Sequence, residues 1–221
     1  MRIPKGVGLK DAASLPEAFC TAWSNIYGLA GLKAGQKLLV HGGSSGVGSA
    51  AIQLCTALGS SVYTTAGSQE RCRQCDALGA DMSINYKESD FEVSIRESLG
   101  RGNGLDVVLD MVGGEYVNKN LRLLGKGGRH ISIAFLGGAK ASLDLTPLLV
   151  RGVSMTGSTL RPKTDEQKAD LCRSLEEVVW PLIEDGKIRP VVSQVLSLGE
   201  AARAHELLEG GHIFGKLVMK V

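Results

Sequence analysis

The chain has 221 residues, of which 43% are hydrophobic and 22% are charged, and its formal net charge is +2. This length and composition suit one globular core and argue against wholesale disorder. Lysines and arginines are scattered, so the charge pattern does not support binding to nucleic acid or to a membrane surface. The sequence has neither an apolar run long enough to span a bilayer nor a signal-peptide core, and we expect a cytoplasmic protein.

Cysteine and histidine spacing predicts no metal site. The five cysteines include the C-x-x-C pair Cys72 and Cys75. A zinc or redox site of this spacing would need a second pair or a strand-to-helix setting, and neither is present. We therefore interpret the pair as two ordinary positions on one helix, and Cys55 and Cys172 as small buried hydrophobic residues.

Strand and helix patterns alternate from Lys37 onward, with short glycine-rich connections. The run "LDVVLDMV" is continuously apolar or β-branched, as in a strand covered on both faces. The predicted strands are 37–40, 61–66, 82–86, 105–112, 129–135 and 153–158, and the predicted helices are 47–58, 68–79, 90–100 and 114–124. This alternation predicts an α/β fold of the Rossmann type, a doubly wound parallel sheet with helices on both faces.

The two ends of the chain show a different pattern. An amphipathic helix is predicted over 164–185, followed by a strand over 191–198, a helix over 201–208 and a strand over 216–221. The rest of the sequence offers these late strands no obvious partner. We therefore expect that a further domain, missing from this sequence, supplies the partners of these strands.

The stretch "HGGSSGVGSA", residues 41–50, follows the first strand and opens the first helix. In this setting backbone amides and a helix N-terminus can face a pyrophosphate, provided that no Cβ keeps the ligand away. Against the pattern G-x-G-x-x-G, Gly43 and Gly48 are in register, while Ser45 replaces the central glycine. The alternative is a structural turn without a ligand, but the strand before it and the helix after it favour a dinucleotide loop.

The end of the second predicted strand indicates which dinucleotide is bound. An NAD site usually has an acidic residue there to hold the ribose 2′-hydroxyl. Here Gly67 and Ser68 occupy that region, and Arg71 follows. A serine and an arginine can bind a 2′-phosphate, so we predict NADPH. The alternative is that Arg71 and Arg73 form a solvated helix face.

The loop also fits the G-x-x-x-G-x-G spacing of short-chain dehydrogenases, through Gly42, Gly46 and Gly48. Those enzymes need a Tyr-x-x-x-Lys pair for proton transfer. None of the four tyrosines has a lysine four residues later. That family is therefore excluded.

Six strings in order resemble the zeta-crystallin-type quinone oxidoreductases, a zinc-free branch of the medium-chain dehydrogenase/reductase superfamily. They are "LPEAFCTAW", "HGGSSGVGSAAIQL", "TAGSQER", "LGADMSINYKE", "DVVLDMVGG" and "HIFGKLVMKV". The resemblance covers nearly the whole chain and is greatest to the tumour-suppressor-inducible branch, which shares the serine at position 45.

The resemblance implies a set of cofactor contacts. The loop would cradle the pyrophosphate, Ser68 and Arg71 would hold the 2′-phosphate, and Tyr86 would pack near the adenosine. Residues after later strands, with Thr21, would contact the nicotinamide half, and Phe214 and Lys216 would make late contacts. The implied contacts are Thr21, Gly43, Ser44, Ser45, Gly46, Val47, Ser68, Arg71, Tyr86, Val112, Phe135, Leu136, Phe214 and Lys216. Core packing is the alternative for the apolar members.

The resemblance also implies a domain division. Residues 1–23 would be a remnant or linker from a GroES-like catalytic domain, 24–160 the NADP-binding domain, and 161–221 a helix and strands returning toward the largely absent domain. That domain would supply much of the quinone pocket. No zinc ligands of the alcohol-dehydrogenase kind are expected here, and a homodimer through the edge strand "VSMTGS" is expected.

The predicted activity is hydride transfer from NADPH to quinones or related conjugated carbonyls, with chemistry supplied by the cofactor. No triad or paired carboxylates appear, so no catalytic residue is assigned. An enoyl-thioester or alkenal reductase and a non-catalytic NADPH-binding module remain alternatives.

Overall fold

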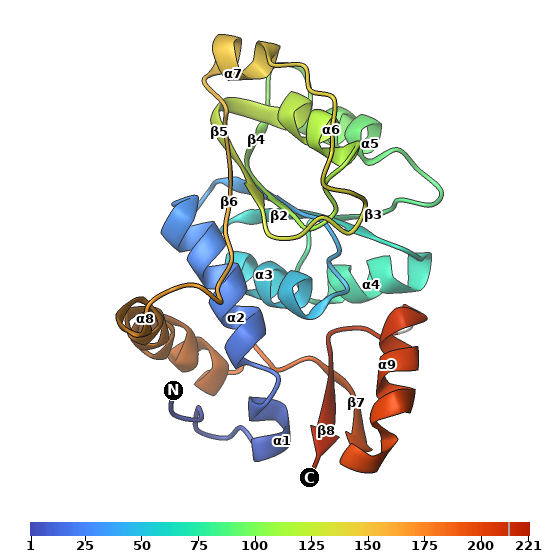
Figure 1. Ribbon diagram of the computed structural model, residues 1–221. Helices are drawn as coiled ribbons and strands as arrows, with labels where there is room; N and C mark the ends of the chain where they lie inside the picture. The colour runs from blue at the N-terminus through green and yellow to red at the C-terminus, as the bar shows by residue number, and fades with distance from the viewer. Residues whose placement is uncertain (212) are drawn as a thin grey trace.

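A computed structural model describes residues 1–211 and 213–221 (Figure 1). Its centre is a six-stranded parallel sheet in the order β3-β2-β1-β4-β5-β6. The strands are β1 (Lys37–Val40), β2 (Ser61–Ala66), β3 (Met82–Asn85), β4 (Leu105–Asp110), β5 (Leu124–Ser132) and β6 (Ser154–Gly157). This is the strand order of the doubly wound dinucleotide-binding fold, so the predicted fold class is confirmed.

Helices cover both faces of this sheet. In Figure 1, α3 and α4 lie on one side of it and α5 and α6 on the other. The bounds are α3 (Gly46–Ala57), α4 (Gln69–Ala77), α5 (Phe91–Leu99) and α6 (Tyr116–Leu123). Each follows a strand and precedes the next one, as expected for parallel strands joined by crossovers.

Alternation along β1 explains why the sheet needs two helical layers. Leu38 and Val40 belong to the core cluster that includes α3, whereas Leu39 belongs to the cluster that includes α5 and α6. Successive strand side chains point to opposite faces, and all three residues are fully buried. A continuous apolar strand therefore requires cover on both sides.

The pairing of β1 creates the crevice in which ligands bind in such folds. Val40 pairs with Thr64 of β2 on one side and with Leu109 of β4 on the other. The chain leaves β1 toward α3 on one face, and it leaves β4 toward α6 on the opposite face. The carboxyl ends of β1 and β4 thus form the topological switch point.

After the short α1 (Leu9–Ala12), which has no buried residue, the chain packs against the same core as α3. The packed elements are α2 (Pro16–Trp23) and the single π-helical turn η1 (Ser24–Leu29). Phe19, Ala22 and Ile26 are buried in the cluster that includes α3 and β1. The division of the chain at residue 23 stays a prediction, but α2 shares the core of the sheet.

The late strands, which had no obvious partner in the sequence, pair with each other. After α8 (Asp165–Glu184), β7 (Val192–Ser197) and β8 (Lys216–Lys220) form a parallel two-stranded sheet. The short turn η2 (Leu198–Glu200) and α9 (Ala201–Glu209) connect them. The amide of Gly215 donates to the carbonyl of Ser44 at 2.8 Å, which attaches this small sheet to the glycine-rich loop.

Two local features differ from the sequence-based expectation. β5 begins at Leu124 and includes the predicted glycine turn, because Leu124 pairs with Leu105 ahead of an irregularity in the register. A short helix that was not expected, α7 (Thr146–Arg151), precedes β6. All four residues of β6 are exposed at the sheet edge, and the expected dimer through this edge stays a prediction.

Within the described residues, no helix has the length and apolar character needed to cross a membrane.

Candidate functional site

The glycine-rich loop lets α3 approach the end of β1 closely. A Cβ on Gly48 would collide with the backbone of Gly42 and Gly43, and a Cβ on Gly43 would collide with the side chain of Thr64. Ser45 caps α3, because its Oγ accepts a hydrogen bond from the amide of Gly48 at 2.9 Å. The two glycines in register with the G-x-G-x-x-G pattern therefore serve packing, and the serine in place of the central glycine serves capping.

The first turn of α3 presents free donors to the cleft. The amides of Gly46 and Val47 have no hydrogen-bond partner among the described residues, as is usual in the first turn of a helix. Both residues are half-buried and line the cleft. The N-terminal end of a twelve-residue helix also carries a partial positive charge. This arrangement suits an anionic group that lies across the loop.

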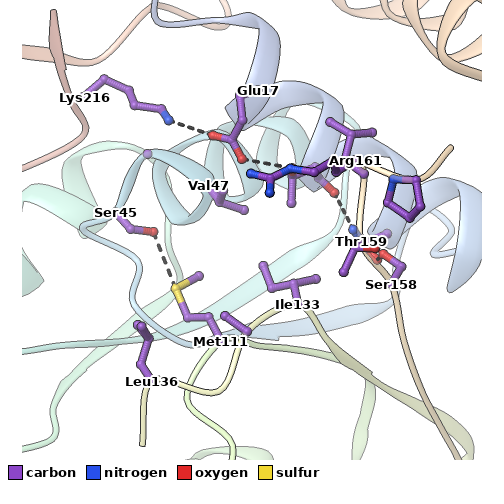
Figure 2. Close-up of a pocket in the computed structure, with 16 residues that line it drawn as sticks. Glu17, Ser45, Val47, Met111, Ile133, Leu136, Ser158, Thr159, Arg161 and Lys216 are labelled. Carbon is purple, nitrogen blue, oxygen red and sulfur yellow. Dashed lines mark hydrogen bonds and ion pairs between the residues drawn. The ribbon is translucent and has the colours of Figure 1, made fainter. Parts of the chain in front are cut away.

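The cleft at the switch point has two chambers that meet at the loop. We call the first the α2 chamber; its volume is about 640 Å³, and Glu17, Thr21 and Asn25 contribute to its wall. The second, the β2 chamber, is about 580 Å³ and is lined by Thr65 and by residues beyond β2 and β3. Both chambers share a boundary formed by Ser45, Gly46, Met111, Leu136 and Lys216. Figure 2 shows the α2 chamber with Lys216 and Glu17 at its rim.

The β2 chamber is cationic. Arg71 and Lys216 line it, and no Asp or Glu is among its described lining residues. Arg71 has no ion-pair partner in the described part of the chain, whereas the neighbouring Arg73 pairs with Glu70 at 2.6 Å. Ser68 caps α4 by accepting a hydrogen bond from the amide of Arg71 at 3.3 Å. The serine thus fixes the start of the helix that carries the arginine.

Most of the predicted site residues lie in the wall of this cleft. Gly43 is buried within the loop, and Ser68 lies at the start of α4. The predicted residues that line one or both chambers are Thr21, Ser44, Ser45, Gly46, Val47, Arg71, Tyr86, Val112, Leu136 and Lys216.

The structure does not bring Phe135 and Phe214 to the cleft. Phe135 is 53% exposed and lines a separate cavity beside β6. Phe214 packs against the main core and borders a cavity between α4 and β7. In a sequence, an apolar residue beside a turn has the same pattern whether it faces a ligand or a core.

A chain of buried polar side chains lies beneath the loop at the carboxyl ends of the strands. His41 Nδ1 is 3.0 Å from Thr65 Oγ1, and His41 Nε2 is 2.8 Å from Asn120 Oδ1. Asn120 Nδ2 donates to Asp110 Oδ2 at 3.2 Å. His130 Nε2 reaches the same carboxylate oxygen at 3.1 Å. All five residues are at most 1% exposed.

The carboxylate fixes the direction of every hydrogen bond in this network. Asp110 accepts only, so His130 Nε2 carries a proton, and the Asn120 oxygen is free to accept from His41 Nε2. His41 Nδ1 then accepts from the hydroxyl of Thr65, and Thr65 Oγ1 accepts from the amide of Gly42 at 3.3 Å. The network therefore begins at the glycine-rich loop.

The other end of the network supports the loop after β4. Asp110 Oδ1 accepts from the amides of Val112 at 2.7 Å and Gly113 at 3.1 Å. Burial raises the pKa of Asp110, but hydrogen bonds, that from His130 foremost, hold the net pKa below its usual range. Burial lowers the pKa of His41, which keeps this imidazole neutral. The network thus links both walls of the cleft through one buried carboxylate.

Comparison with known proteins identifies the family. The model of the family described as "Zinc-binding dehydrogenase" matches residues 46–176, more than half of the chain. The chain belongs to this family.

Within the zinc-binding dehydrogenase family, the chain is similar to quinone oxidoreductases, which the sequence motifs also suggest. It is 30% identical to the quinone oxidoreductase of Mus musculus over 221 residues, which is 98% of this chain and 64% of that protein. The chain thus spans less than two thirds of the length of this relative.

Two solved structures share the fold over the whole chain. The quinone oxidoreductase of Thermus thermophilus, described with its NADPH complex, superposes with a TM-score of 0.85 at 28% identity and is covered over 69% of its length. A structure described as an NAD-dependent alcohol dehydrogenase superposes equally well, at 34% identity over 61% of its length. The two descriptions name different nicotinamide cofactors, so the residues of this chain must provide the argument for either one.

The name of this zinc-binding dehydrogenase family refers to a metal. In the part of the chain that the structure describes, no group of three His, Cys, Asp or Glu side chains could hold a metal ion. The C-x-x-C pair lies buried on α4, and burial raises the pKa of Cys75 to about 12, which disfavours the thiolate. These two cysteines are core residues.

Sequence reasoning missed two groups of residues in this family member. One is the buried network, whose signal is a polar residue at the carboxyl end of an apolar strand, as in the final Asp110 of "LDVVLD". The other is the polar part of the α2 chamber. There Asn25 Oδ1 accepts from Ser158 at 2.6 Å, and Arg161 and Glu17 line the wall. These residues are brought together by the fold from distant positions and share no local motif.

Proposed function

We propose that this chain binds NADPH across the glycine-rich loop and forms the cofactor-binding part of a reductase of quinones or related conjugated carbonyls. The observation that carries this proposal is the pairing of a dinucleotide loop with a chamber that contains two cations and no described acid. NADPH has a diphosphate and a 2′-phosphate, and both need such surroundings.

The diphosphate fits the first turn of α3. Open amides at Gly46 and Val47 and the end of the helix dipole favour an anion there. The side chain of Lys216 lies over the same turn, as shown by its contact with a Cβ built on Gly46. A diphosphate in this position would lead into the α2 chamber on one side and the β2 chamber on the other.

The 2′-phosphate is assigned to Arg71 and Ser68. Arg71 faces the β2 chamber and has no carboxylate partner among the described residues. Ser68 lies one turn before it and retains a hydroxyl proton that can be donated. Tyr86, which lines the same chamber, offers a ring against which an adenosine can pack. NADH would leave the guanidinium without an anionic partner.

NADPH, when bound, supplies the hydride, so the protein's residues have to bind, orient and shield the reacting groups. The α2 chamber is the place for the reactive half, since it lies on the other side of the loop from Arg71. Its wall contains apolar side chains such as Val47 and Ile133 beside polar ones from α2. No side chain of this chain is assigned a proton-transfer role.

Calorimetric titration with NADPH and NADH tests the cofactor assignment. We expect NADPH to bind more tightly than NADH, and Arg71→Ala to weaken NADPH about tenfold or more through the loss of a charge-assisted contact. NADH affinity should not change in that variant. Arg73→Ala removes the same charge from a side chain that pairs with Glu70, and it should leave both affinities unchanged. Equal binding of NADPH and NADH by the unmodified chain would contradict the assignment.

Acceptor dependence tests the reaction. Oxidation of NADPH should require an added acceptor. The acceptors to compare are a quinone, an alkenal and an enoyl thioester. Turnover with a quinone supports the proposal. Turnover with only an enoyl thioester supports the alternative, an enoyl-thioester reductase. The assay needs the full-length protein if residues outside this chain line the acceptor pocket. NADPH binding without turnover of any acceptor would identify a binding module.

The expected homodimer is part of the same proposal. β6 presents an exposed edge, and the preceding helix α7 has two strongly exposed apolar residues, Leu149 at 87% and Val150 at 72%. Such an edge tends to acquire a partner strand. Light scattering should give twice the mass of the chain, and a monomer at high concentration would contradict a dimer.

A further inference from the structure

An ion pair crosses the candidate cofactor cleft between opposite ends of the chain. Lys216 Nζ of β8 lies 2.7 Å from Glu17 Oε2 of α2, across a separation of 199 residues. The second carboxylate oxygen of Glu17 accepts a hydrogen bond from Thr21 Oγ1 at 3.2 Å. Figure 2 shows Lys216 extending toward Glu17 above the residues of the α2 chamber.

The stem of Lys216 occupies the surface over which a diphosphate would lie. A Cβ built on Gly46 would be 2.6 Å from Cε and 2.7 Å from Cδ of this lysine, so the stem rests on the first turn of α3. Lys216 is also among the five residues that line both chambers. A dinucleotide that enters both chambers therefore has to displace this side chain from its contact with Glu17.

The backbone of Lys216 is fixed, so only its side chain can respond. The amide of Lys216 donates to the carbonyl of Val191 at 2.8 Å, and the amide of Gly215 donates to Ser44 at 2.8 Å. Gly215 has a φ of +82°, and a Cβ there would collide with Val191. The backbone of the lysine is thereby held beside the glycine-rich loop, and the long side chain remains flexible.

We propose that Glu17 is a positioning residue that sets the affinity of the cleft for dinucleotides by competing with the diphosphate for Lys216. This inference rests on the proposed function. In the cofactor-free chain Glu17 holds the ammonium group over the loop, and the bound diphosphate takes that group over. No bond is made or broken, and the acid and the phosphate exchange one cation.

The exposure of the pair makes this exchange feasible. The side chains of Lys216 and Glu17 are 33% and 61% exposed, and ion pairs in such surroundings contribute little to stability. A diphosphate offers two negative charges beside the end of a helix dipole, whereas Glu17 offers one in largely solvated surroundings. The balance therefore favours the ligand, but part of the binding free energy is used to separate the existing pair.

A double-mutant cycle measures this competition. NADPH is titrated calorimetrically into the unmodified chain, Glu17→Gln, Lys216→Met and the double variant. Glu17→Gln should tighten NADPH binding about fivefold, because the competitor is removed. Lys216→Met should weaken it about tenfold, because a charge-assisted contact is lost. In the Lys216→Met background, the change at position 17 should alter affinity by less than about twofold.

Two controls separate this competition from a general effect of charge. Glu166→Gln changes the net charge equally at an exposed position of α8 that lines neither chamber, and it should leave NADPH affinity unchanged. Adenosine 2′-monophosphate has the 2′-phosphate but no diphosphate, so its affinity should be the same with and without Glu17→Gln.

The possible outcomes distinguish the two proposals. If the unmodified chain binds neither NADPH nor adenosine 2′-monophosphate, the proposed function is wrong and the competition has no ligand. If NADPH binds but Glu17→Gln does not tighten it, the role of Glu17 is wrong although the proposed function stands. A gain that persists in the Lys216→Met background, or that also occurs with adenosine 2′-monophosphate, would show that Glu17 acts through its own charge.

Discussion

The glycine-rich loop and the buried network beneath it meet at the same strand ends, but they shape the cleft in opposite ways. The loop acts by lacking side chains, so that α3 can approach the backbone of Gly42 and Gly43. The network acts through side chains that are almost completely buried and bonded to one another. The loop provides the surface for a ligand, and the network holds that surface in place.

This contrast shows how the two walls of the cleft are held in position relative to each other. Gly42 belongs to the loop after β1, and Val112 and Gly113 belong to the loop after β4, yet all three amides bond into one network. An unpaired buried polar group in low dielectric is costly, and His130 Nδ1 in this network already has no hydrogen-bond partner among the described residues. Removing one central member should therefore disturb both walls.

The largest expected effect is that of Asp110→Ala. This change leaves His130, Asn120 and two backbone amides without their shared acceptor, and loss of one partner from a buried pair costs about 3–5 kcal/mol. Asp106→Ala is the matched control on the same strand, because that half-buried carboxylate bonds to Gln36 and to the amide of Lys37 near water. Urea denaturation should show a much smaller loss for the control. Equal losses would mean that the network has no special weight.

Gly48→Ala should have the next largest effect. Its Cβ would collide with backbone atoms of Gly42 and Gly43, which cannot move without displacing the loop. We expect a loss of about 3 kcal/mol from overpacking, despite the higher helix propensity of alanine. Gly46→Ala is the control two residues earlier, where the Cβ would meet only the flexible stem of Lys216. Its free energy of unfolding should change by less than about 0.5 kcal/mol.

The same contrast explains how much of the molecule could be predicted from its sequence. The fold and the loop were predictable, because apolar periodicity and the glycine spacing are local patterns that extend over neighbouring residues. Arg71 was also predictable, since its distance from the loop along the chain follows from the length of one βαβ unit. The structure places each of these residues in or beside the cleft.

The network and the ion pair across the cleft could not be predicted in this way. His41 and Asn120 are 79 residues apart, and Glu17 and Lys216 are 199 residues apart. Their contacts depend on strand order and on where the short sheet of β7 and β8 attaches to the loop. The pairing of β7 with β8 was missed for a similar reason, since each strand alone shows only that it needs a partner.

The pH dependence of stability tests the protonation state assigned to the network. Burial lowers the pKa of His41 below 6.5, with the charge of His130 adding to this and Asp110 and Asn120 opposing it. As the pH falls below about 6.5, His41 therefore binds a proton in the unfolded chain but not in the folded chain. The free energy of unfolding then declines by up to about 1.4 kcal/mol per pH unit. Above that pH the contribution of His41 is fully present.

His41→Gln should flatten this decline between about pH 6.5 and 5, although it lowers stability at neutral pH. The measurement is the free energy of unfolding in urea at several pH values. His205→Gln is the control, because His205 is exposed on α9, and its slope should match that of the unmodified chain. An unchanged slope in His41→Gln would show that another group accounts for the acid sensitivity.

The smallest expected effect separates the two functions assigned to Ser45. Ser45→Ala removes the cap on the amide of Gly48 and should cost about 1 kcal/mol in the free energy of unfolding. Ser44→Ala changes a neighbouring hydroxyl that does not cap α3, and it should cost less than about 0.5 kcal/mol.

Ser45→Asp restores a capping oxygen and adds a negative charge at the start of α3, so stability should return to that of the unmodified chain. The same charge would face the diphosphate, and NADPH affinity should fall about tenfold or more. If Ser45→Asp regained stability and bound NADPH as well as the unmodified chain does, the diphosphate would have to lie elsewhere.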